Sequence, residues 1–169
     1  DQGLNEFTGV FSNVIEWVES TVDYYSGHSE IDLWIKPHPL EIRGTVKSNK
    51  SVNDFIRTKY PILPKNIHLI DADLAINPYH LFPFIDLGVV LTGTLGLEMA
   101  LENIDVVSAG VNPCHGLGLL SEPKNKKAYF EAINEWDNSP KRKDELERFA
   151  YFYFINQSFK WPLSGKVWG

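Results

Sequence analysis

A strand that breaks at a glycine and resumes as a helix constrains the fold of this chain more than any other feature. Residues 89–91 are apolar with strand character, the triplet Thr92-Gly93-Thr94 interrupts them, and residues 95–101 resume with a helical pattern. Glycine lets the backbone turn tightly and approach a ligand closely. The pattern therefore predicts a strand–turn–helix unit, which is a building block of α/β proteins.

The same turn offers the groups that a phosphate ester and a ribose require. The first N–H groups of a helix have no partner within the helix and attract anions. Thr92 and Thr94 add hydroxyl groups, and Glu98 can accept hydrogen bonds from sugar hydroxyls one turn later. With Gly93, these residues form a candidate nucleotide-sugar site. The alternative is an ordinary capped turn, in which Glu98 only stabilises the helix dipole.

A second candidate loop follows another predicted strand. Residues 31–36, with Trp34 at their centre, read as a buried strand that runs into Pro37-His38-Pro39. The prolines restrict the backbone and hold His38 in a stiff loop. Because ligands of open α/β sheets bind at the carboxyl ends of strands, we expect Lys36 and His38 to share one sheet edge with the threonine turn. There His38 can donate to a phosphate or to a carboxylate on the sugar, and Lys36 can add positive charge. The alternative for His38 is a surface loop without a ligand.

Strand and helix patterns alternate along the whole chain. They predict helices at residues 4–25, 51–60, 77–84, 94–102, 124–136 and 141–156, and strands at 31–36, 67–70, 87–91 and 105–108. This alternation predicts an α/β fold with a Rossmann-like, doubly wound parallel sheet and helices on both faces. Residues 1–169 are expected to form a single domain, with Trp34, Tyr60 and Tyr79 in its core and an irregular aromatic tail from Trp161.

Charge and composition exclude several classes of protein. A net charge of −6 and a pI near 5.3 argue against a nucleic-acid-binding protein, which normally has a basic face. The single cysteine, Cys114, excludes an internal disulfide and fits a reducing cytoplasm. No stretch reads as a signal peptide or as a membrane span. We expect a cytoplasmic protein whose basic residues 141–143 could touch the inner face of an anionic membrane.

The sequence does not predict a metal site. His68 and His80 have no acidic or cysteine partner at metal-ligand spacing. Asp71-Ala72-Asp73 has the spelling of a metal motif, but an Asp-x-Asp before a helix is more often a turn or a cap. No cofactor is expected beyond a nucleotide-sugar donor substrate whose base the sequence does not specify.

Several motifs, taken in order, resemble the capsule polysaccharide biosynthesis proteins, which are bacterial-type glycosyltransferases of the GT-B type related to Kdo transferases. The resemblance covers residues 31–135, and Cys114-His115 stands where the family has a histidine followed by an aromatic residue. The motifs that carry it are Ile35-Lys36-Pro37-His38-Pro39, Thr92-Gly93-Thr94-Leu95-Gly96-Leu97-Glu98, Val106-Val107-Ser108-Ala109-Gly110, Cys114-His115-Gly116-Leu117-Gly118-Leu119 and Tyr129-Phe130.

The resemblance implies a function and a second domain that binds the acceptor. Such transferases join an N-terminal acceptor domain to a C-terminal nucleotide-sugar domain, and this chain is similar to the C-terminal half. It implies a nucleotide-sugar as ligand, a polysaccharide or a lipid-linked acceptor as co-substrate, and Lys36, His38, Thr92, Gly93, Thr94 and Glu98 as the binding residues. Because the catalytic acid or base often lies in the other half, we expect this chain to bind its donor without turnover.

Two other readings remain open from the sequence. One is half of a sugar-nucleotide epimerase, which uses the same fold and a similar glycine-rich turn. The other is a non-catalytic α/β interaction domain in which His38 and Glu98 are structural. A glycerophosphate-polymerising transferase ranks lower, since acidic and serine-rich residues are expected where this chain has the threonine–glycine turn.

Overall fold

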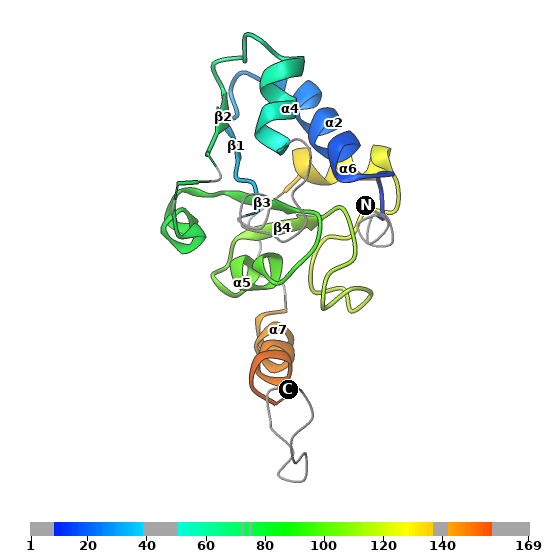
Figure 1. Cartoon of the computed structure of the whole chain (residues 1–169). Helices are drawn as coiled ribbons and strands as arrows, with labels where there is room; N and C mark the ends of the chain where they lie inside the picture. The colour runs from blue at the N-terminus through cyan, green and yellow to red at the C-terminus, as the bar shows by residue number, and fades with distance from the viewer. Residues whose placement is uncertain (1–8, 39–50, 72, 75, 137–141, 157–169) are drawn as a thin grey trace, which may run out of the picture. The chain divides into compact units, whose positions relative to one another are not determined.

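The computed structural model describes residues 9–38, 51–71, 73–74, 76–136 and 142–156 (Figure 1). The chain divides into two compact units, Asp1–Pro83 and Phe84–Gly169, which are described separately below. Both units combine helices with a short parallel strand pair, so the fold is of the mixed α/β class.

The first unit packs two helices on a two-stranded parallel sheet. Helix α2 (Val14–Ser26) and helix α4 (Val52–Lys59) cover strands β1 (Leu33–Ile35) and β2 (Ile67–Leu69). The core cluster comprises Val18, Val22, Val52 and Ile56, with Leu33, Ile35 and Leu69 packed against it. Two 3-10 turns follow, η1 (Pro78–His80) and η2 (Phe82–Phe84).

Local sequence signals set the ends of these helices. Ser51 and Asp54 form a reciprocal capping box at the start of α4. Asn13 caps α2, since its side chain accepts a hydrogen bond from the Glu16 N–H. Helix α2 therefore begins at Val14, later than the predicted start; residues 4–8 of that prediction lie outside the described residues.

The second unit is a strand–helix–strand arrangement with further helices. Strand β3 (Leu87–Val90) pairs in parallel with β4 (Asp105–Ser108), and helix α5 (Leu95–Leu101) connects them. Ser121 adds one parallel bridge to Val107 on β4. Helix α6 (Lys126–Asn134), helix α7 (Lys143–Ala150) and the π-helix η3 (Tyr151–Asn156) complete the unit. Its core includes Leu97, Val107, Tyr129, Ile133 and Leu146.

The strand positions and their parallel pairing confirm the coarse prediction. All four predicted strands are present, but in the described part of the chain they form two separate two-stranded sheets. The continuous doubly wound sheet and the single domain over residues 1–169 stay predictions. The helix predicted at 77–84 is wrong: it is two 3-10 turns, because Pro83 has no N–H and its ring clashes with the carbonyl one turn earlier. The predicted start of the last helix at residue 141 and the tail from Trp161 lie outside the described residues.

Two of the predicted core aromatics are exposed. Trp34 is 59% exposed and Tyr79 is 52% exposed, so their placement in the core is wrong. Side chains of a strand alternate between its two faces. Leu33 and Ile35 take the core side of β1, so Trp34 lies on the opposite face, stacked on His68 of β2 with the ring centroids 4.7 Å apart. Tyr60 is partly buried.

A glycine brings helix α5 close to strand β3. A Cβ atom at Gly96 would lie 2.9 Å from Val90 Cγ2, closer than carbon atoms pack. Because Val90 is a β-branched core residue with little freedom to move, α5 can sit at this distance only with glycine at position 96. This contact fixes where the turn between β3 and α5 lies.

We predict that Gly96→Val lowers the free energy of unfolding by about 1–3 kcal/mol through overpacking against Val90. The matched control is Ala100→Val, one turn later on the same helix and only partly buried. Helix propensity alone predicts that Gly96→Val costs less stability than Ala100→Val, because valine is a better helix former than glycine and a worse one than alanine. Urea unfolding of both variants measures the difference, and a smaller loss at position 96 than at position 100 would contradict the packing argument.

Candidate functional site

The threonine turn lies directly after the carboxyl end of β3. Gly93 has a φ of +94°, a left-handed value that glycine adopts without strain, and a Cβ atom there would meet nothing within 4 Å. The space around the turn is therefore open. Thr94 precedes α5, and its side chain makes no capping hydrogen bond to that helix. The turn thus combines open space at Gly93 with a Thr94 hydroxyl that does not cap the helix.

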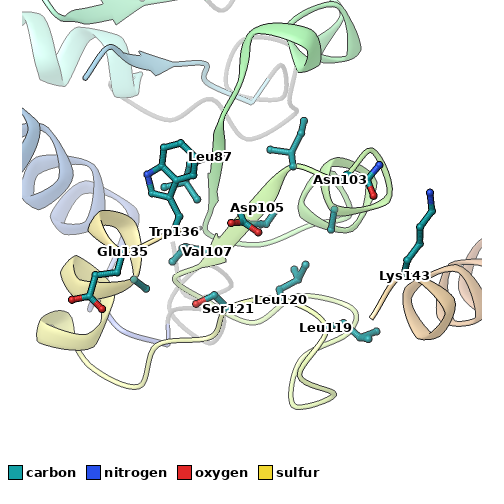
Figure 2. A pocket seen from close by; sticks show the side chains of 14 residues that line it. Leu87, Asn103, Asp105, Val107, Leu119, Leu120, Ser121, Glu135, Trp136 and Lys143 are labelled. Carbon is teal, nitrogen blue, oxygen red and sulfur yellow. The ribbon is translucent and has the colours of Figure 1, made fainter. Parts of the chain in front are cut away.

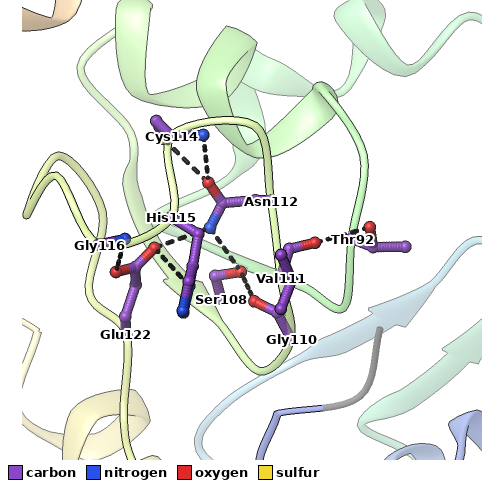
Figure 3. Close-up of polar contacts among 9 residues, drawn as sticks. All are labelled: Thr92, Ser108, Gly110, Val111, Asn112, Cys114, His115, Gly116 and Glu122. Atoms are coloured by element: carbon purple, nitrogen blue, oxygen red, sulfur yellow. Dashed lines mark hydrogen bonds and ion pairs between the residues drawn. The ribbon is translucent and has the colours of Figure 1, made fainter. Parts of the chain in front are cut away.

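A second loop, residues 109–122, begins at the carboxyl end of β4. The parallel pairing of Val90 with Ser108 brings the ends of both strands to one edge. Two hydrogen bonds of 2.8 Å tie the 109–122 loop to this edge. The Ala109 N–H donates to the Val90 carbonyl at the end of β3, and the Thr92 hydroxyl of the threonine turn donates to the Val111 carbonyl. The threonine turn and the 109–122 loop therefore form one surface at the carboxyl edge of the second unit (Figure 3).

Asn112 organises the 109–122 loop from a buried position. It is 6% exposed, and its amide nitrogen donates to the Ser108 hydroxyl at 3.1 Å and to Glu122 Oε1 at 3.0 Å. Its carbonyl oxygen accepts from the backbone N–H of Cys114 at 2.8 Å and from the Cys114 thiol at 3.0 Å. Figure 3 shows how these bonds close the loop around the amide. One side chain thus bonds to two positions of the loop, Cys114 and Glu122, and to Ser108 at the end of β4.

Glu122 is the second centre of the same network. Its carboxylate accepts the Gly116 N–H at 2.9 Å through Oε2, and Oε1 lies 3.2 Å from His115 Nδ1. The Glu122 side chain is 15% exposed and that of His115 is 51% exposed. Sequence reasoning missed both Glu122 and Asn112 as site residues. The signal available was a glutamate before Pro123, which reads equally well as the start of a helix.

Cys114 is not a nucleophile in this network. The thiol is fully buried, and burial together with the nearby Glu122 charge raises its pKa to about 11. The thiolate is the reactive form of cysteine, so at neutral pH this side chain behaves as a small packed group.

Thr92, Gly93, Thr94 and Glu98 lie together on the turn and the first turns of α5. Glu98 is partly buried, and its N–H donates to the Thr94 carbonyl at 3.0 Å. The structure therefore brings these four predicted residues to one place in the second unit.

Lys36 and His38 belong to the first unit, directly after β1. Lys36 is partly buried and His38 is exposed, while Pro39 lies outside the described residues. The expectation that these two residues share an edge with the threonine turn stays a prediction.

Asp71, the first residue of the Asp-x-Asp motif after β2, forms an ion pair with a residue of α4. Arg57 of α4 donates to Asp71 at 2.5 Å, and this ion pair raises the pKa of the guanidinium. In the described parts of the chain, no three His, Cys, Asp or Glu side chains gather closely enough to hold a metal ion. Asp71 is therefore the ion-pair partner of Arg57 at the surface, with both side chains about half exposed.

A cavity of about 210 Å³ lies beside the amino ends of β3 and β4, where these strands begin at Leu87 and Asp105 (Figure 2). Trp136 and Asn103 line it together with apolar residues of β4 and of the 109–122 loop. None of the six residues predicted for the nucleotide-sugar site lines this cavity.

Comparisons with protein-family models, with curated proteins and with solved structures give no match to this chain. Among the helices of the described residues, none combines the length and the apolar character that crossing a bilayer requires.

We predict that Asn112→Ala lowers the free energy of unfolding by about 1–3 kcal/mol, because it removes a donor from Glu122 and from Ser108 and leaves the buried Cys114 N–H without its acceptor. The matched control is Asn134→Ala on the exposed side of α6, for which a change within about 0.5 kcal/mol is expected. Chemical denaturation measures both values. Equal effects of the two variants would show that the amide does not organise the loop.

Proposed function

We propose that this chain is the nucleotide-sugar-binding part of a glycosyltransferase in capsule or surface polysaccharide biosynthesis. The observation that carries the proposal is the strand–turn–helix unit of β3 and α5, in which Gly93 adopts a left-handed φ at the carboxyl edge of a parallel strand pair. Ligands of α/β folds bind at this edge. The resemblance of the motifs at residues 31–135 to the capsule polysaccharide proteins supports the same function.

The chemistry proposed for the site is binding of the donor and stabilisation of its leaving group. Glycosyl transfer from a nucleotide donor releases a phosphate-bearing nucleotide, and preorganised donors that meet its developing charge lower the barrier. The backbone N–H groups after Gly93 and the Thr94 hydroxyl are the donors, and Glu98 is the acceptor for ribose hydroxyls. An Asp-x-Asp metal motif is not part of this proposal.

The proposal extends to the rest of the predicted architecture. The two parallel strand pairs would belong to one doubly wound, Rossmann-like sheet. Lys36 would add positive charge for the phosphates, and His38 would donate a hydrogen bond to them. An acceptor domain would bind the polysaccharide or the lipid-linked acceptor. These points rest on the sequence motifs and not on the arrangement of the two units.

The test is a thermal-shift and calorimetry panel with CMP, UDP, GDP and CDP-linked ligands. A ligand that binds the folded state raises the melting temperature by linkage. We predict that Thr94→Ala and His38→Ala each weaken nucleotide binding by roughly ten- to a hundredfold, the value of a charge-assisted phosphate contact of about 1.5–3 kcal/mol.

Exposed residues elsewhere on the chain provide the matched controls. Thr58→Ala on α4 and His80→Ala in η1 should leave the affinity unchanged. If every nucleotide in the panel binds the Thr94→Ala and His38→Ala variants as tightly as the parent chain, or if none binds the parent chain, the proposed function is wrong.

A further inference from the structure

The His115–Glu122 pair has a geometry that the proposed phosphate contacts do not use. Glu122 is largely buried, and both of its oxygens are engaged: Oε1 with Asn112 and His115, and Oε2 with the Gly116 N–H. The carboxylate is thus fixed in orientation, and His115 Nδ1 lies 3.2 Å from it. Half of the His115 side chain remains exposed at the edge of the 109–122 loop (Figure 3).

The pairing decides which nitrogen of His115 carries the proton. An ionised carboxylate only accepts hydrogen bonds, so the Nδ1 atom that faces Glu122 carries a hydrogen. This assignment follows from the hydrogen-bond network. In the neutral imidazole the other nitrogen, Nε2, then carries a lone pair and accepts a hydrogen bond. The partner that fits it is a donor such as a hydroxyl group.

The charge around His115 favours a hydroxyl over a phosphate as the ligand group. In the neutral tautomer with its hydrogen on Nδ1, His115 has no hydrogen on Nε2 to give to a phosphate oxygen, and the Glu122 carboxylate on the far side of the ring repels an anion. The phosphate donors of the proposed site are instead the N–H groups at Gly93 and Thr94. Thr92 joins that turn to Val111 of the same loop that carries His115.

We propose that the His115–Glu122 pair recognises a hydroxyl group of the nucleotide-sugar, with His115 Nε2 accepting the hydrogen bond and Glu122 holding the imidazole in the required tautomer. This inference rests on the proposed function and deepens it, because it names a polyol group as the part of the ligand that the 109–122 loop binds. The hydroxyl comes from the ribose or from the transferred sugar, and the two sources are separated by the choice of ligand.

The chain contains a matched histidine–carboxylate pair for comparison. His68 Nε2 lies 2.9 Å from Asp32 Oδ1, but this pair sits on the exposed face of β1 and β2, where Asp32 is 68% exposed and the His68 ring is stacked on Trp34. Both pairs join an imidazole to a carboxylate, but they differ in their surroundings and in the nitrogen that faces the carboxylate, which is Nε2 in His68 and Nδ1 in His115. His68 is therefore the internal reference for effects that any paired histidine would show.

The experiment is a long-range proton–nitrogen NMR correlation of the whole chain labelled with [15N]histidine, with binding followed in parallel by calorimetry. The spectra are recorded at alkaline pH, where imidazoles are neutral, and before ligand is added we expect His115 to show its hydrogen on Nδ1 and none on Nε2. The panel contains UDP, CMP and GDP, their 2′-deoxy forms, the corresponding nucleotide-sugars, and methyl glycosides alone. The His115→Phe variant assigns the resonance.

We expect the His115 Nε2 resonance to move on ligand addition while both ring-nitrogen resonances of His68 stay in place. Movement with UDP but not with 2′-deoxy-UDP would identify the ribose, and movement only with the nucleotide-sugar or the glycoside would identify the sugar. His115→Phe should weaken binding of that ligand by about three- to tenfold, the value of one neutral hydrogen bond, and His68→Phe should not.

The outcomes separate this inference from the proposed function. An Nε2 resonance that no member of the panel moves overturns the inference. If calorimetry detects nucleotide binding in that case, the proposed function stands without the His115 contact. If calorimetry detects no binding, the proposed function is overturned as well.

Discussion

The loop that follows β4 depends on one partly buried carboxylate. Glu122 accepts hydrogen bonds from Asn112 and Gly116 and pairs with His115, so three separate points of the loop are tied to the same group. Removing either partner of such a network leaves a polar group without its bonds in a poorly solvated place, which costs more than the bond itself contributes. The position of the loop beside the threonine turn follows from this network.

The threonine turn itself is held by backbone constraints. Gly93 supplies the left-handed φ, and Gly96 lets α5 approach β3 more closely than any side chain permits. The Thr92 hydroxyl is already used in a bond to Val111, so within the described part of the chain its role is to join two loops. Thr94 and the N–H groups after Gly93 are therefore better candidates for a ligand than Thr92, although the motif includes both threonines.

The sequence predicts best what is decided locally. The capping box at Ser51 and the break at Gly93 mark the starts of α4 and α5 within one or two residues, because caps and glycines act on their neighbours. The exposure of Trp34 and the roles of Asn112 and Glu122 depend on contacts between distant residues, which no local pattern encodes. Which strands pair with each other likewise depends on contacts between residues far apart in the sequence. The sequence thus showed the turn and the 114–119 motif of the loop beside it, but not the hydrogen-bond network of Asn112 and Glu122 that holds this loop.

The central claim is that the turn after β3 binds the phosphates of a nucleotide. The most direct measurement follows the backbone amide resonances of Gly93, Thr94 and Leu95 while a nucleoside diphosphate is added, with the free nucleoside as the control. The account predicts saturable shifts at these three amides with the diphosphate and none with the nucleoside. Shifts centred on another part of the chain, or equal shifts with both compounds, would contradict it.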